Sequence, residues 1–279
     1  MLKDIGEWPD HKACIESAKR ICSWLYNSNS LHHMMKKAIG GELVKWNATR
    51  FGTNYMFLES IMRKKDQFMQ WMVTSEFRES RHFKSEMGQY AFQTLTSLDW
   101  WNNMKYVLDD VEPLYSFLRF ADQDKVPTLG EVHVQYQNTK LTYTANLSQT
   151  NPVRLEQIID IIDSRMCNVM LGTYGQVASA LNPLVNYTMG SSESLMVDLR
   201  RGLERMVDTN KAALALQEAD FFKQKRGDFS GELARRLAVD RSTSPASWWS
   251  MFGADTPTLQ ELAMKLLSQC ASSSGCERN

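Results

Sequence analysis

The stretch from Leu98 to Asp124 constrains the fold most, because its apolar residues repeat at the spacing of an α-helix. It reads "LDWWNNMKYVLDDVEPLYSFLRFADQD", and large apolar side chains recur every three or four residues for about five turns: Trp101, Met104, Leu108, Val111, Tyr115 and Leu118. Pro113 interrupts this rhythm, so we expect a kink there or a new helix that begins near it. The pattern predicts a mainly α-helical protein.

Several other segments show the same period. Between residues 10 and 28 one helical face collects Cys14, Ala18, Ile21, Cys22 and Leu25. Further helices are predicted from Leu58 to Met72, from Pro152 to Val169, from Ser191 to Val207 and around Lys211 to Lys225. A fold with more than about a fifth of its residues in strands would contradict this interpretation.

The segment 131–147 is ambiguous. Its residues alternate as a hairpin does, in "VHVQY" and again in "LTYTANL", and its many Thr and Tyr favour strands. Helical spacing also fits, through Leu129, Val132, Tyr136, Tyr143 and Leu147. We predict a helix because the neighbouring segments are helical, and strands, if present, are expected here.

Charge and cysteine content exclude several classes of protein. The chain balances 32 basic with 32 acidic residues, so no global field draws it to nucleic acid or to an anionic membrane. Its five Cys and five His show no ligand spacing typical of a zinc site. No window is apolar enough for a membrane helix, and the N-terminus lacks the apolar core of a signal peptide. We expect a soluble, intracellular protein.

The last 40 residues combine a linker with an apolar cluster. Residues 241–247 have mostly short, polar side chains and include a proline, which predicts a linker at a domain boundary. Further on, Thr256 can cap a helix whose first residue is Pro257. Aromatic residues precede this helix and leucines repeat along it: Trp248, Trp249, Phe252, Leu259, Leu262 and Leu266. Such a cluster is either a helix that closes the core or a subunit interface.

Catalytic and nucleotide-binding motifs do not occur. The sequence has no Gly-rich phosphate loop, no GxSxG and no HExxH. These signals alone indicate a mainly helical protein and no particular chemistry.

The order of four motifs resembles that of plant hAT-type transposases and the host proteins derived from them. "NATRFGTNYMFLESI" is similar to the family's Arg-Trp stretch with its long helix, and residues 113–122 to its "PL-x-x-x-LR-x-x-D" motif. "IID-x-R" occurs at 161–165 and is followed by "LNP" at 181–183. "P-A-x-WW-x-x-FG" begins at Pro245 and leads to a serine-rich turn and to Cys276, Glu277 and Arg278. The resemblance spans nearly the whole chain.

The resemblance implies a split catalytic fold. In complete members a large helical insertion divides a ribonuclease-H-like domain, where two aspartates and a glutamate hold divalent metals. Glu277 matches that glutamate, while both aspartates would lie before the point that Met1 resembles. The resemblance therefore implies a chain without its catalytic strands: residues 1–45 as a helix flanking the missing core, 46–240 as the insertion domain, and 245–279 as the start of the C-terminal dimerisation region.

Arg50 and Phe51 occupy the positions of the family's Arg-Trp pair, whose indole stacks on an extruded base. Phe51 keeps an aromatic face but has less area and no indole donor. Two interpretations stay open: a retained contact with DNA, or a core residue at the start of a helix.

These implications give the functional hypotheses. The first is a nuclear, transposase-derived protein without catalysis of its own, acting through association with itself or another hAT-type protein, with residual DNA binding. The alternative is an active nuclease completed by a second polypeptide that supplies the two aspartates, and a decayed gene product is a third. No cofactor, membrane or small-molecule ligand is expected, and Mg²⁺ only in a completed core. The self-association surface is predicted at the six apolar residues of the C-terminal cluster.

Overall fold

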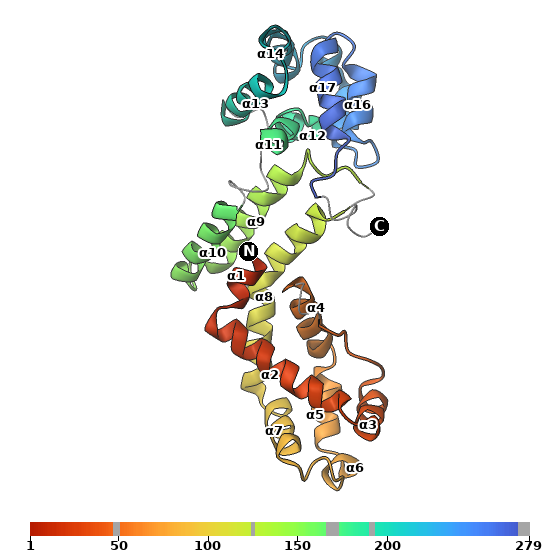
Figure 1. Cartoon of the computed structure of the whole chain (residues 1–279). Helices are drawn as coiled ribbons and strands as arrows, with labels where there is room; N and C mark the ends of the chain where they lie inside the picture. The colour runs from red at the N-terminus through yellow and green to blue at the C-terminus, as the bar shows by residue number, and fades with distance from the viewer. Residues whose placement is uncertain (47–50, 124–125, 166–172, 190–192, 273–279) are drawn as a thin grey trace. The chain divides into compact units, whose positions relative to one another are not determined.

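The computed structural model describes residues 1–46, 51–123, 126–165, 173–189 and 193–272. Within these ranges the regular secondary structure is helical and contains no strand (Figure 1), which confirms the predicted mainly α fold. The chain divides into two compact units, Met1–Tyr115 (unit 1) and Ser116–Asn279 (unit 2). The boundary falls inside a single helix, α8, which runs through Pro113 without a new helix beginning there.

Unit 1 consists of short and medium helices. In chain order these are α1 (Leu2–Gly6), α2 (Pro9–Tyr26), α3 (Asn29–Ile39), α4 (Phe51–Met62), α5 (Lys65–Met72), α6 (Ser75–Arg78), α7 (Glu86–Leu95) and the first part of α8 (Leu98–Ala121).

The core of unit 1 contains the predicted face of α2 and a buried stripe of α8. Cys14, Ala18, Ile21, Cys22 and Leu25 are all buried, as their spacing predicts. Burial raises the pKa of the Cys14 and Cys22 thiols to about 12, with a further rise at Cys14 from Asp10 and a partial offset at Cys22 from Lys45. These two cysteines are therefore packing residues with unreactive thiols.

The buried stripe of α8 also carries an acidic residue, Asp110, which contacts α2. His11 of α2 is fully buried, and its Nε2 lies 2.9 Å from Oδ2 of Asp110. Tyr55 of α4 places its hydroxyl 3.5 Å from the other ring nitrogen of His11. Three helices of unit 1 thus meet at one polar cluster inside an otherwise apolar core.

Unit 2 begins with the end of α8. It continues through α9 (Val132–Leu147), α10 (Pro152–Arg165), α11 (Thr173–Ala180), α12 (Pro183–Thr188), α13 (Glu193–Met206), α14 (Thr209–Lys223), the 3-10 helix η2 (Gly227–Ser230), α15 (Glu232–Val239), α16 (Pro245–Phe252) and α17 (Pro257–Leu267).

The ambiguous segment 131–147 is helical, as predicted. Val132, Tyr136, Thr139 and Tyr143 are buried on one face of α9. Its threonines, which favour strands in isolation, donate their hydroxyl hydrogens to carbonyls four residues back, for example Thr139 to Gln135 at 2.8 Å. Burial of the tyrosines and satisfaction of the hydroxyls outweigh the local preference for strand.

The helices α9 and α10 are joined by a polar contact. Lys140 of α9 places its Nζ 2.8 Å from the carboxylate of Asp163 on α10, and Tyr136 donates its hydroxyl to the same carboxylate. Partial burial acts to raise the pKa of Asp163, but hydrogen bonds from Lys140 and Tyr136 outweigh it and lower the pKa. Asp163, the aspartate of the "IID-x-R" motif, therefore has a structural role, because it links α10 to α9.

The segment 241–247, predicted as a linker, is a short turn followed by the first residues of α16. It connects α15 and α16, which pack against each other within unit 2. No helix in the described ranges is long and apolar enough to cross a membrane.

Candidate self-association region

The aromatic residues of the C-terminal region form one cluster inside unit 2. Trp248 and Trp249 are fully buried, and their ring centroids lie 5.7 Å apart in an edge-to-face arrangement. Phe229 of η2 stacks on Trp248 with ring centroids 5.6 Å apart, and Phe222 of α14 lies 4.7 Å from Trp249. Helices α14, α16 and η2 therefore share one aromatic core.

Both indole nitrogens donate hydrogen bonds to backbone carbonyls of the same unit. Trp248 donates to the carbonyl of Ala234 on α15, and Trp249 to the carbonyl of Leu181 before α12, each at 2.8 Å. Because a buried indole N–H needs an acceptor, these bonds fix the orientation of both rings.

The "LNP" motif and the residues that follow it add buried polar contacts to unit 2. Asn182 is fully buried, accepts a hydrogen bond from the amide of Leu184 and so caps α12, and donates to the carbonyl of Gly130 at 3.0 Å. Asn186, one turn later, donates to the carbonyl of Phe222 at 2.8 Å. Asn182 of the motif thus joins α12 to the segment before α9, and Asn186 joins α12 to α14.

Helix α17 begins where Pro257 predicts, but its cap comes from elsewhere in the sequence. Thr256 occupies the N-cap position and its hydroxyl donates to the carbonyl of Gly253. The first turn of α17 is satisfied instead by Glu218 of α14, whose carboxylate accepts the amide hydrogen of Leu259 at 2.6 Å. A capping partner 41 residues away cannot be read from local sequence.

The six residues predicted as a self-association surface lie mostly in the interior. Five are buried and Phe252 is half-buried against the same core: Trp248, Trp249, Phe252, Leu259, Leu262 and Leu266. A side chain that is covered by its own chain offers little area to a second copy. The structure thus places these residues in the core that closes unit 2, which was the other interpretation of the cluster.

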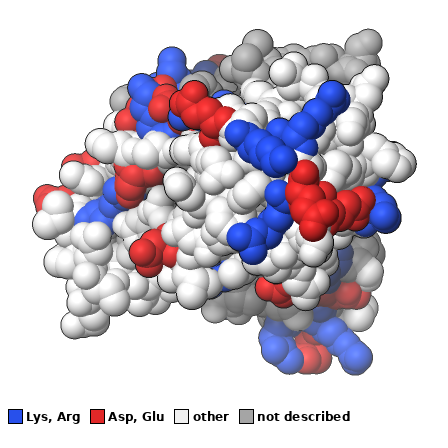
Figure 2. Space-filling model, turned by 90° about the horizontal axis from the view of Figure 1, so that it is seen from below, with Lys and Arg blue, Asp and Glu red and all other residues white. Residues whose placement is uncertain are grey.

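The remaining predicted site residues fall largely outside the described ranges. Arg50 and Glu277 are not among the described residues, and of Phe51 only the backbone, as the first residue of α4, is described. In the described part of the chain, no three His, Cys, Asp or Glu side chains are grouped as a metal site would require. On the face drawn in Figure 2, Lys and Arg side chains lie interspersed with Asp and Glu.

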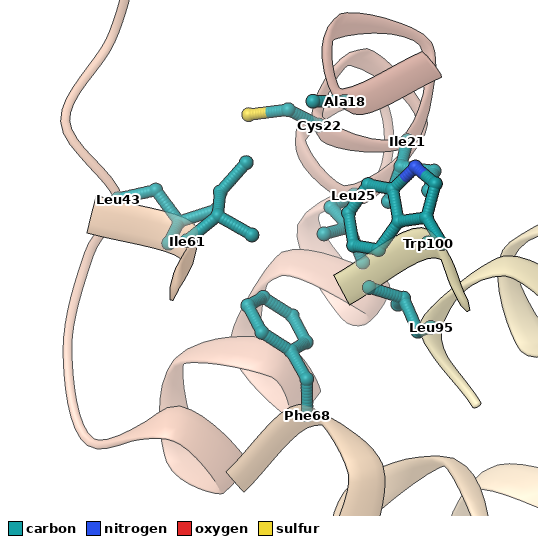
Figure 3. A pocket seen from close by; sticks show the side chains of 9 residues that line it. All are labelled: Ala18, Ile21, Cys22, Leu25, Leu43, Ile61, Phe68, Leu95 and Trp100. Atoms are coloured by element: carbon teal, nitrogen blue, oxygen red, sulfur yellow. The ribbon is translucent and has the colours of Figure 1, made fainter. Parts of the chain in front are cut away.

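A small cavity in unit 1 gives no room for a ligand. It has a volume of about 10 Å³ and is lined by apolar residues of α2, the α3–α4 connection, α4, α5, α7 and α8 (Figure 3). Cys22 and Trp100 belong to this lining, and the thiol faces Ile61 and Leu43. Such a volume holds at most one water molecule, and a water needs polar partners, so the cavity is a packing defect.

Comparison with known proteins identifies the C-terminal region. Residues 217–279 match the family model described as the hAT family C-terminal dimerisation region. This region of the chain is therefore similar to the hAT dimerisation region. The match confirms the resemblance to hAT transposases, and it includes η2, α15, α16, α17 and the end of α14.

Two further comparisons give no relatives. No curated protein and no solved structure matches the chain significantly.

Sequence reasoning missed the apolar side chains that remain exposed near this region. Leu214 and Phe221 of α14 are 49% and 44% exposed. They are seven residues apart, which places them on one helical face, so the same periodicity that predicted α14 could have identified them.

Proposed function

We propose that this chain is a transposase-derived protein that acts through protein association and has no nuclease activity of its own. The observation that carries the proposal is the match of residues 217–279 to the hAT dimerisation region. The chain would associate with a second copy of itself or with another hAT-type protein. We propose a nuclear location, because a protein related to transposases acts where chromosomal DNA lies.

The proposed lack of catalysis follows from the number of carboxylates. A two-metal site requires several clustered carboxylates, because each ion needs anionic ligands on more than one side. The resemblance assigns one of the family's three, Glu277, to this chain. The helical part before residue 245 would correspond to the insertion domain of the split ribonuclease-H-like fold, and Arg50 with Phe51 would be its residual contact with DNA.

Self-association is tested by sedimentation of the purified chain over a range of concentrations. A dimer whose dissociation constant is about 10 μM would be half-dissociated near that concentration, well within the range of the method. A chain that remains monomeric at about 100 μM would contradict self-association.

The alternative function is a nuclease completed in trans, and it has its own test. The chain is incubated with supercoiled plasmid and Mg²⁺, alone and together with the amino-terminal half of a complete hAT transposase. We expect no nicking by the chain alone and none by the chain together with that amino-terminal half. Metal-dependent nicking that appears only in the mixture, and that Glu277→Gln abolishes, would support the alternative and overturn the proposal.

A further inference from the structure

Helix α14 carries one face that the chain itself leaves uncovered. Its opposite face is buried through Ala212, Ala215, Ala219 and Phe222, which pack into the core of unit 2. The exposed face follows a regular spacing of four, three, four and three residues: Asn210, Leu214, Gln217, Phe221 and Gln224. This is the average spacing of 3.5 residues at which two helices pack along a common seam.

The seam contains no charged residue, although charged residues flank it. Lys211 pairs with Glu261 of α17 at 2.8 Å, and Asp220 pairs with Arg226. Glu218 is engaged by the backbone of α17. The seam itself consists of apolar and amide side chains, and the charged side chains named here are bound within the chain. A centre poor in free charge is typical of a protein interface.

Phe221 is also held in place at the surface. The guanidinium of Arg226 lies 4.4 Å from the centroid of the Phe221 ring. A ring that is ordered before binding loses less side-chain entropy when a partner covers it. Aromatic residues and arginine are enriched at protein interfaces.

Resting on the proposed function, we propose that α14 is the contact between two copies of this chain, packed antiparallel about a two-fold axis near Gln217. In that arrangement Leu214 of one copy lies opposite Phe221 of the second copy, and the two Gln217 amides meet at the axis. The pairing is self-complementary, as a two-fold interface requires. Leu214 and Phe221 are about 10.5 Å apart along the helix, so both pairs form at once.

A second copy is the favoured occupant because the matched dimerisation region begins at residue 217, on this face. The tryptophans of that region and the leucines of α17, Leu259, Leu262, Leu266 and Leu267, are already buried in the core. The other large apolar side chains exposed in its described part are Leu233 and Val239 on α15 and Met251 on α16. Leu233 and Val239 are six residues apart and so point in different directions, and Met251 is alone on its helix.

The first experiment compares Leu214→Asp and Phe221→Asp with Leu233→Asp by sedimentation. Leu233 is 62% exposed, so its variant adds the same charge outside the seam. We expect the first two variants to raise the dissociation constant at least tenfold and the control to leave it unchanged. Melting followed by circular dichroism verifies that each variant is folded.

The second experiment tests the antiparallel direction by oxidative crosslinking. Gln217→Cys should form a disulfide-linked dimer, because the two residues meet at the axis. Leu214→Cys alone should not crosslink above the wild-type background, whereas an equal mixture with Phe221→Cys should. Crosslinking of Leu214→Cys with itself would overturn the antiparallel arrangement.

The outcomes separate this inference from the proposed function. A wild-type dimer that Leu214→Asp and Phe221→Asp weaken selectively supports both. A wild-type dimer that these variants leave intact overturns the α14 contact and keeps self-association. A strictly monomeric wild type overturns the α14 contact together with self-association, and leaves association with another hAT-type protein as the form of the proposed function.

Discussion

The indole nitrogen of Trp249 donates a hydrogen bond to the backbone carbonyl of Leu181 at 2.8 Å, and both residues are fully buried. This contact joins the "WW" motif of α16 to the "LNP" motif before α12, 68 residues earlier in the chain. Two motifs whose order suggested the hAT resemblance are therefore structural partners within one unit.

Trp249→Ala is expected to destabilise unit 2 by about 3–5 kcal/mol, because it removes a buried aromatic ring and leaves a cavity. Trp249→Phe keeps most of the packing and should cost about 1–3 kcal/mol, through the loss of the hydrogen bond. Chemical denaturation measures both. Met251→Ala on the exposed side of the same helix is the matched control and should change stability by less than about 0.5 kcal/mol. A Trp249→Ala protein of unchanged stability that no longer dimerises would instead place this ring at the interface.

Helical periodicity predicted the type of the elements more accurately than the identity of their buried residues. Along α8 the sequence indicated Trp101, Met104, Leu108, Val111, Tyr115 and Leu118, and three of these, Trp101, Met104 and Val111, are buried. At the other positions the adjacent apolar residues Val107, Leu114 and Phe117 are buried instead. Neighbouring residues are about 100° apart on a helix, so two adjacent apolar residues both fit a broad stripe, and packing decides between them.

The sequence also could not separate core from interface at the C-terminal cluster. Both interpretations require large apolar residues at helical spacing, and both therefore fit Trp248, Trp249 and Leu262. The distinguishing contacts are with Leu181, Ala234 and Phe222, which lie outside the cluster in the sequence. Only the tertiary structure shows that these partners already cover it.

Gly202→Ala is expected to destabilise unit 2 although alanine favours helices. A Cβ at Gly202 on α13 would lie 2.0 Å from Cγ2 of Val177 on α11, a buried side chain with little rotational freedom. Helix propensity contributes about 1 kcal/mol in favour of alanine, and overpacking costs about 1–3 kcal/mol, so a net loss is predicted. Thermal melting of the variant and the wild type measures this net loss of stability. Gly231→Ala is the control, because its Cβ would have only an ordinary contact, 3.7 Å from the carbonyl of Asp228. A Gly202→Ala protein more stable than the wild type would contradict the close packing of α11 and α13.

The buried pair of His11 and Asp110 gives a prediction for unit 1. Asp110→Leu leaves the imidazole without its carboxylate in an apolar core, and the expected cost is about 3–5 kcal/mol. His11→Phe should be similarly costly, because it leaves the carboxylate buried. The double variant should lose much less than the sum of the two, since neither the imidazole nor the carboxylate then remains in the core. Chemical denaturation of all four proteins measures this coupling, and additive losses would show that the two side chains act independently.

The last prediction concerns stability in acid. Glu42 follows α3 and accepts hydrogen bonds from His32 at 2.8 Å and from Tyr26 at 2.9 Å, with Lys36 at 3.0 Å. Hydrogen bonds from His32, then Lys36, then Tyr26 lower the pKa of Glu42 from 4.5 to about 2. A carboxylate whose pKa is lowered on folding stabilises the protein fully above its ordinary pKa, and this contribution is lost as the pH falls from 4.5 toward 2.

Glu42→Gln should therefore lower the melting temperature at neutral pH, and its difference from the wild type should shrink between pH 4.5 and 2. Melting curves over that pH range measure this, at low salt because the carboxylate is exposed and salt screens it. Glu79→Gln removes an exposed charge from the same unit and is the control for net charge. A difference between Glu42→Gln and the wild type that stays constant down to pH 2 would show that the carboxylate is not held by these three partners.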